Sequence, residues 1–201
     1  MVPSALHDAL RRRPGPARTA ALAAWFQGLF EDPRTAPVLV GGGAVELYTS
    51  GSYLTGDLDF VGVVSDPVAQ QMTLVGFRRM GRHWVHEESQ VFIELPARSF
   101  DAETRIDEVR FDAFRVRVIS LENALVDRLL AWCSWNSAVD GVNAYLLWRV
   151  RGRDLDRAWL DRLAAREDAR DALDALEAYI ERLGDRIPSL EEVEEWARTR
   201  V

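Results

Sequence analysis

One stretch, GGGAVELYTSGSYLTGDLDF at residues 41–60, constrains this chain more than any other. An apolar run at residues 38–40 leads into three glycines, a short helical pattern and a Gly/Ser/Thr-rich turn follow, and the stretch closes on Asp57-Leu58-Asp59 at the start of an apolar strand. Strand residues i and i+2 point to the same face, about 7 Å apart. We therefore expect both carboxylates on one face and Leu58 on the other, towards a core.

The two ends of this stretch suit different parts of one ligand. Neighbouring carboxylates repel each other and require a counter-charge. A hard cation such as Mg²⁺ supplies it, because Mg²⁺ prefers a few carboxylates together with substrate phosphates. Gly42 and Gly43 open a helix and allow close backbone approach, and the N–H groups at a helix start suit a phosphate. The combination indicates nucleotide chemistry, and the alternative is a plain strand–turn–helix with solvated aspartates.

Two glycines, a helix and Asp-x-Asp on a strand resemble the signature of the DNA polymerase β-type nucleotidyltransferase superfamily. The finer pattern, Gly-Gly-x-Ala-x-x-Leu and then Thr-x-Asp-Leu-Asp-Phe, is similar to small bacterial nucleotidyltransferases of abortive-infection and toxin–antitoxin systems. Tyr53 departs from that pattern, because such proteins often have Arg two residues before the Thr. The residues that carry the resemblance are Gly42, Gly43, Ala44 (one place early), Leu47, Thr55, Asp57, Leu58, Asp59 and Phe60.

The resemblance implies an enzyme that moves a nucleoside monophosphate from an NTP to an acceptor and releases pyrophosphate. Mg²⁺, or Mn²⁺ in its place, would be held by Asp57, Asp59 and a third carboxylate, and Gly42, Gly43 and Thr55 would bind the nucleotide. The acceptor would be an RNA such as tRNA, or a protein, and an antitoxin would be the natural partner of a toxin of this kind. The alternative is a catalytically inactive nucleotidyltransferase fold that serves as a nucleotide-binding or protein-interaction module.

The third carboxylate of such a mechanism must lie on a neighbouring strand, where two metal ions are bridged. Glu94 is our prediction for this catalytic and metal-binding position, within the apolar strand at residues 91–95. A charged residue in so apolar a strand is costly unless it is paired or faces an open side. The alternative is a solvent-facing glutamate, and Glu87 and Glu88 are rivals in a polar, turn-like run.

Arg128 and Asp140 form a second group of candidate site residues. In the resembling family, a Lys or Arg on the first helix after the strands faces the nucleotide, and an acidic residue at the start of the next helix faces the active site. Arg128 and Asp140 match that order and are predicted to bind substrate, since a planar guanidinium offsets triphosphate charge well. The alternative for Arg128 is a structural role, with a partly buried aliphatic stem and its guanidinium at the surface. The alternative for Asp140 is the N-cap of its helix.

The net charge of −7 argues against a broad, sequence-blind nucleic-acid surface, but it is compatible with one local basic groove. Arg78, Arg79, Arg82 and His83 form a basic cluster. They would line an acceptor groove or form a solvated turn, and the solvated turn is the favoured interpretation.

The cysteine content and the N-terminal residues give expectations about disulfides and location. The single cysteine, Cys133, excludes an internal disulfide, and its apolar helical surroundings predict burial. The N-terminus lacks the apolar core of a signal peptide, and no apolar run is long enough to span a membrane. We therefore expect a cytoplasmic protein without membrane contact.

The element pattern predicts an α+β fold, with a nucleotidyltransferase-like mixed sheet and flanking helices at residues 1–119, followed by a helical half at residues 120–201. Phe111 and Phe114 flank a predicted hairpin turn, and Ser189 with Glu192 forms a capping box. The predicted strands lie at residues 38–40, 57–64, 90–95 and 115–119. The predicted helices of this half lie at residues 17–30, 44–49 and 66–75.

Overall fold

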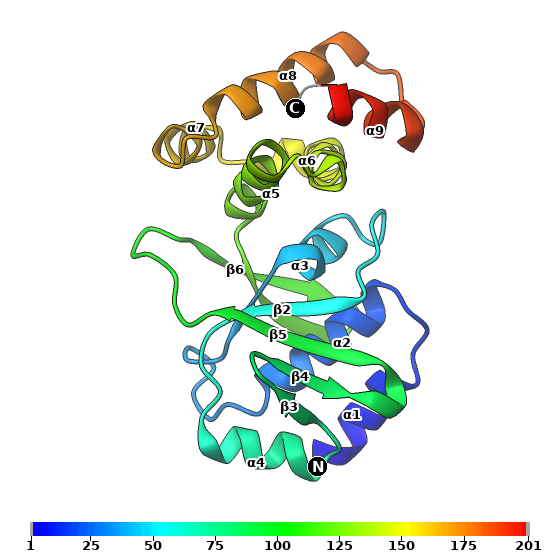
Figure 1. Cartoon of the computed structure of the whole chain (residues 1–201), viewed down its shortest axis with the longest axis vertical. Helices are drawn as coiled ribbons and strands as arrows, with labels where there is room; N and C mark the ends of the chain where they lie inside the picture. Colours follow the sequence, from blue (N-terminus) through cyan, green and yellow to red (C-terminus); the bar gives the residue numbers. More distant parts are fainter. Residues whose placement is uncertain (1, 200–201) are drawn as a thin grey trace. The chain divides into compact units, whose positions relative to one another are not determined.

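The computed structural model describes residues 2–199, with side chains from residue 4 onward. The chain divides into two compact units, with the boundary between Ser120 and Leu121. Within the described residues, the first unit is built around a seven-stranded mixed sheet and the second consists of helices (Figure 1). The predicted α+β class with a mixed sheet and accompanying helices is confirmed.

The strands of the sheet lie in the order β3-β4-β5-β2-β1-β7-β6. β2 pairs with β5 and β1 pairs with β7 in parallel, and all other neighbours are antiparallel. The centre of the sheet is therefore assembled from segments far apart in the sequence. The strand bounds are β1 Val38–Val40, β2 Asp57–Val61, β3 Arg78–Met80, β4 His83–His86, β5 Val91–Ala97, β6 Ile106–Phe111 and β7 Phe114–Ile119.

One face of the sheet carries the core of the first unit. Leu39 of β1 is aligned with Phe60 of β2 and with Val118 of β7, and all three are fully buried. Phe26 packs edge-on against Phe60, with ring centroids 4.8 Å apart. Burial of each such side chain stabilises the fold by about 1.5–3 kcal/mol. Because side chains alternate along a strand, Asp59 next to Phe60 points to the opposite face.

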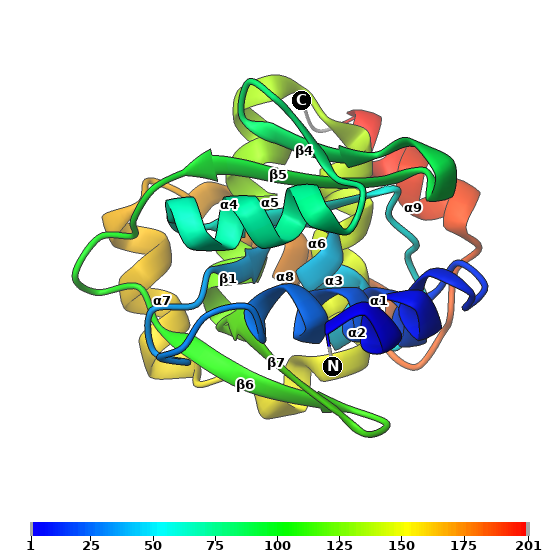
Figure 2. The same ribbon diagram turned by 90° about the horizontal axis from the view of Figure 1, so that it is seen from below.

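The helices of this unit connect and cover the strands (Figure 2). They are α1 Val2–Leu10, α2 Pro16–Gln27, α3 Gly41–Tyr48 and α4 Asp66–Leu74, with a short 3₁₀ turn, η1 Glu87–Ser89. Phe26 belongs to α2, which therefore contributes directly to the core face of the sheet.

Three local expectations are corrected by the structure. The strand predicted at residues 57–64 ends at Val61, because Gly62 takes a φ of 155° and packs against Pro37. β5 continues through Pro96 to Ala97, where the register with β2 shifts and accommodates a residue without an N–H group. Cys133, predicted to be buried, is exposed.

The second unit is a helical assembly with an aromatic centre. The ring of Trp196 lies 4.8 Å from that of Trp132 and stacks on Tyr179 at 4.2 Å. The predicted capping box is confirmed, because the Glu192 N–H donates to Ser189 Oγ and the Ser189 N–H donates to Glu192 Oε2. The elements are α5 Leu121–Trp135, α6 Ala138–Arg151, η2 Gly152–Asp154, α7 Arg157–Arg166, α8 Arg170–Leu183 and α9 Leu190–Thr199.

Among residues 2–199, no helix has the length and apolar character needed to cross a membrane.

Candidate functional site: carboxylates beside a glycine-led helix

Asp57, Asp59 and Glu94 lie on one face of two adjacent strands. These strands, β2 and β5, run side by side in the sheet (Figure 1). Asp59 of β2 is aligned with Glu94 of β5, and the alternate residues Leu58 and Ile93 are aligned on the opposite, buried face. Aligned residues on neighbouring strands lie about 5 Å apart. Asp57 is exposed, whereas Asp59 and Glu94 are half-buried. Three carboxylates therefore converge on a surface that solvent reaches.

Glu94 is held by two basic side chains from the β3–β4 hairpin. Arg82 Nε lies 2.6 Å from Glu94 Oε1, and His83 Nδ1 lies 3.6 Å from Oε2. Arg82 offsets the charge that Glu94 would otherwise present to the aspartates. With the side chains in these positions, no cluster of three or more His, Cys, Asp and Glu residues in the described part of the chain is arranged to hold a metal ion.

The start of α3 lies directly against Asp59. Gly41 takes a φ of 60°, which glycine adopts readily, and a Cβ at this position would lie 2.4 Å from Asp59 Oδ2. A side chain at residue 41 would therefore displace the carboxylate. Gly41 was not predicted as a site residue, although it is the first of the three glycines in the sequence.

The predicted nucleotide-binding residues Gly42 and Gly43 occupy different environments. A Cβ on Gly42 would lie 2.7 Å from Thr55 Oγ1 and 3.3 Å from Tyr53 Cε1. Gly43 is buried, and a Cβ there would lie 3.0 Å from a methyl carbon of Leu39. Gly42 thus faces the loop before β2, while Gly43 allows α3 to pack closely on β1.

Thr55 fixes the loop that enters β2. Its hydroxyl donates to the carbonyl oxygen of Asp57 at 3.1 Å and accepts from the Asp57 N–H at 3.4 Å. Its Oγ1 lies over Gly42, so Thr55 links the helix start to the strand that carries the aspartates. The structure therefore brings Gly42, Thr55, Asp57, Asp59 and Glu94 into one contiguous region of the first unit.

A buried carboxyl group that sequence reasoning missed supports this region from inside. Glu46 of α3 is 1% exposed, and its Oε2 accepts a 2.9 Å hydrogen bond from Thr19 of α2. The same oxygen lies 3.5 Å from the backbone nitrogen of Thr55. Burial raises the pKa of Glu46, and the hydrogen bonds from Thr19 and Thr55 only partly oppose that effect. A charged residue amid the apolar pattern of α3 was the available signal.

Arg128 and Asp140, the remaining predicted site residues, belong to the helical unit and pair with each other. Asp127 completes the cluster at 2.5 Å from Arg128. Burial lowers the pKa of Arg128, but Asp127 and Asp140 outweigh it and raise the pKa overall. Ser137 occupies the N-cap position of α6, so Asp140 lies in the first turn and is not the cap that the alternative interpretation assumed.

Comparison with protein-family models gave no match, and comparisons with curated proteins and with solved structures gave none either.

Proposed function

We propose that this protein is a metal-dependent nucleotidyltransferase of the polymerase β type, with a motif similar to those of small bacterial toxin and abortive-infection enzymes. The observation that carries the proposal is the alignment of Asp57, Asp59 and Glu94 on one sheet face, against the glycine-led start of α3. A carboxylate set on a sheet face and exposed N–H groups at a helix start are the two features that NTP·Mg²⁺ binding requires.

The chemistry of these residues supports Mg²⁺, or Mn²⁺ in its place, and the side chains would have to move to hold the ion. Asp57, Asp59 and Glu94 would hold the ion through carboxylate oxygens, the ligands that hard divalent cations prefer. Glycine at position 41 is consistent with this role, because a side chain there would displace the Asp59 carboxylate. Arg82 would have to release Glu94, and its side chain is 64% exposed, so it is free to move into solvent. When bound, the metal would neutralise charge on the triphosphate and the attacking oxygen.

The chain's own residues would bind and orient the nucleotide. Gly42 and the N–H groups at the start of α3 would contact phosphate oxygens, and Thr55 would keep the loop before β2 in place. Gly43 would contribute to nucleotide binding indirectly, because it allows α3 to pack closely on β1. Arg128 and Asp140 of the helical unit pair with each other, and the substrate-binding role expected for them stays a prediction. The acceptor would be an RNA or a protein, with an antitoxin as the regulatory partner.

A second candidate function is a nucleotide-binding or protein-interaction module without catalytic activity. It is favoured by the Arg82–Glu94 ion pair, which occupies the third carboxylate. Tyr53 beside Gly42 also favours it, since a basic residue is usual there in the resembling proteins. A module of this kind has no need of a metal, so its nucleotide binding would be independent of Mg²⁺.

The deciding experiment incubates the protein with each labelled NTP, Mg²⁺ or Mn²⁺, and total cell RNA or cell lysate, and then identifies the labelled product. Asp57→Asn and Asp59→Asn keep the size of each side chain but remove the charge that would hold the metal. Loss of one well-placed electrostatic group typically lowers a rate about 10²–10³-fold, and we expect at least that loss here.

Asp112→Asn is the matched control for these variants. Asp112 lies at the exposed β6–β7 turn with a φ of 51°, a conformation that Asn adopts readily. This control should transfer nucleotide at the parent rate. If both Asn variants on β2 also transfer at the parent rate, the proposed mechanism is wrong. Metal-independent NTP binding without transfer would favour the non-catalytic module.

A further inference from the structure

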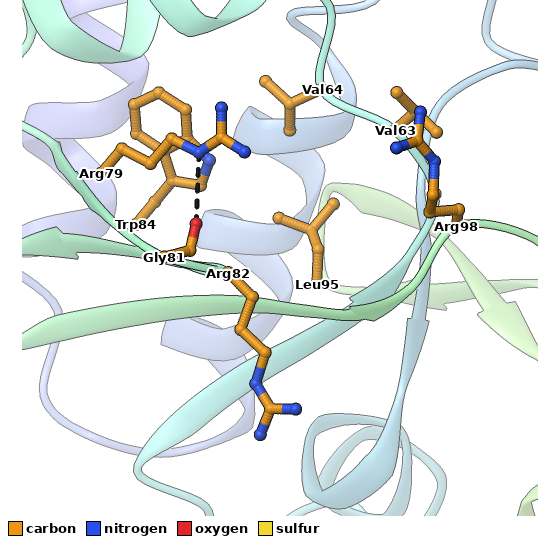
Figure 3. Close-up of a pocket in the computed structure, with 9 residues that line it drawn as sticks. Val63, Val64, Arg79, Gly81, Arg82, Trp84, Leu95 and Arg98 are labelled. Atoms are coloured by element: carbon orange, nitrogen blue, oxygen red, sulfur yellow. Dashed lines mark hydrogen bonds between the residues drawn. The ribbon is translucent and has the colours of Figure 1, made fainter.

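Two cavities of the first unit are lined in part by arginine, and they differ in their relation to the candidate carboxylates. The larger one measures about 460 Å³ and has Arg79 and Arg98 at opposite ends (Figure 3). Trp84, in its wall, is aligned with Ile93 on the buried face of the sheet, whereas Glu94 lies on the other face. The larger cavity is therefore separate from the candidate site.

The smaller cavity, of about 40 Å³, lies next to the candidate site. Thr55 and Asp57 contribute to its wall, together with Arg18 near the start of α2. Leu58 and Val91 close it towards the core, so it lies at the edge of the sheet where β2 and β5 begin. Sites for whole small ligands measure about 300–1,000 Å³, so this space suits a phosphate-sized group and excludes a nucleoside.

Arg18 brings a half-buried positive charge to this cavity. Its Nη2 donates to the carbonyl oxygen of Ser89 at 3.0 Å. Its Nε is buried and has no hydrogen-bond partner, and no carboxylate forms an ion pair with Arg18, among the residues that the structure describes. Buried charges are costly unless they are paired and hydrogen-bonded. A bound anion would supply the pairing that the chain itself does not give to Arg18.

Asp57 determines which kind of anion fits beside Arg18. Its carboxylate belongs to a residue that lines the same cavity, so an isolated anion there would meet a like charge. A polyphosphate bound to a divalent cation brings its own counter-charge, and such cations prefer carboxylate and phosphate oxygens. The loop at residues 49–56 contains no Lys or Arg, so α2 supplies the cation next to the start of β2.

We propose that Arg18 binds the pyrophosphate portion of the nucleotide, which comprises the two phosphates that leave. The inference rests on the proposed nucleotidyltransferase function and deepens it, because it assigns a phosphate ligand outside the motif at residues 41–60. The Arg18 guanidinium offsets the charge of these phosphates through N–H groups that include Nε, while its hydrogen bond to Ser89 keeps it in place. The cavity then holds the far end of a nucleotide whose reacting phosphate lies at Asp57 and Asp59.

Equilibrium dialysis of labelled pyrophosphate against the full chain in Mg²⁺ tests this assignment without an acceptor and without nucleotide transfer. Arg18→Gln keeps a polar side chain but removes the charge. One charge-assisted contact corresponds to roughly 10–100-fold in affinity, so Arg18→Gln should weaken pyrophosphate binding by that factor. Arg18→Lys keeps the charge but loses the planar fork, so its affinity should lie between those of the parent and Arg18→Gln. Unchanged pyrophosphate binding by Arg18→Gln would overturn the proposal.

Arg13→Gln is the matched control, because Arg13 is exposed, precedes Arg18 closely in the chain and does not line the cavity. Its pyrophosphate affinity should stay within about two-fold of the parent, since charges in solvent are largely screened. Equal losses in Arg13→Gln and Arg18→Gln would show a net-charge effect and overturn the proposal. Loss of pyrophosphate binding only in variants whose ligand-free Tm also falls would indicate a structural role for Arg18 and overturn it as well.

Three comparisons separate this inference from the proposed function and from other phosphate sources. An unlabelled NTP should displace labelled pyrophosphate, and failure of every common NTP to do so would overturn the proposal. Inorganic phosphate that binds as tightly as pyrophosphate, with the same dependence on Arg18, would assign the site to a single phosphate and overturn it too.

The third comparison is with nucleotide transfer itself. Pyrophosphate and NTP binding that depends on Arg18, in a protein that transfers no nucleotide, would support the site while the proposed function fails. Transfer that depends on Asp57 and Asp59, with a pyrophosphate affinity independent of Arg18, would overturn this inference alone.

Discussion

Replacement of Glu46 by Gln tests the physical basis of the site without reference to any activity. Glu46 is 1% exposed between α2 and the loop before β2, and its Oε1 has no hydrogen-bond partner within the described residues. Burial raises its pKa above the ordinary value of 4.5. Gln keeps the shape and one acceptor oxygen for Thr19 but cannot ionise, so it mimics the protonated acid.

The expected size of the effect follows from proton linkage. Below about pH 4.5 the Glu46 carboxyl is protonated in the folded and in the unfolded chain, so its burial as a neutral group contributes fully to the stability of the fold. As the pH rises, the unfolded chain ionises first, so the parent loses stability until the pH passes the folded-state pKa. Within that window the loss approaches about 1.4 kcal/mol per pH unit. The amide introduced by Glu46→Gln cannot lose a proton and escapes this loss, so the stability of the variant relative to the parent should rise with pH.

The assay is urea unfolding of the parent and of Glu46→Gln, followed by circular dichroism between about pH 4 and pH 8. The difference between the two proteins isolates Glu46, because every other titrating group is common to both. Glu88→Gln is the control, because it removes one carboxyl group from an exposed position. Thr19→Val removes the hydrogen bond that lowers the pKa of Glu46, so it should extend the loss of stability to higher pH. A stability difference for Glu46→Gln that is flat across this range would refute the reasoning.

Three further substitutions should change stability by amounts that the structure determines, each measured from urea midpoints. Gly41→Ala should cost at least about 1–2 kcal/mol, because φ is 60° and the new Cβ would meet the Asp59 carboxylate; an unchanged midpoint would contradict the close approach. Asp140→Ala should cost about 1–3 kcal/mol, because it removes one partner from the largely buried Arg128; a stabilised variant would contradict it. Phe26→Ala should cost about 3–5 kcal/mol, because the ring is fully buried against neighbouring aromatic rings; a loss below about 1 kcal/mol would show that the core refills the space.

Local features of this chain were determined by the sequence itself. The alternation around Leu58 places Asp57 and Asp59 on one face because the strand period is two, whatever lies beside the strand. The hairpin between Phe111 and Phe114 was predicted from its turn residues, and Asp112 adopts the positive φ that such turns use. The capping box at Ser189 was predicted for the same reason, since its bonds join residues three apart.

Tertiary structure alone decided which distant residues meet. Glu94 could be predicted as a third carboxylate only through the motif, because the parallel pairing of β5 with β2 depends on the packing of the whole sheet. No local signal could place Arg82 on Glu94, or bring Arg79 and Arg98 to the lining of one cavity. The sequence shows Glu46 as a charged residue in an apolar helical pattern, but only the packing of α2 on α3 made it a buried acid. Periodicity and capping act over a few residues of chain, whereas ion pairs, burial and raised pKa values depend on neighbours that only the folded chain supplies.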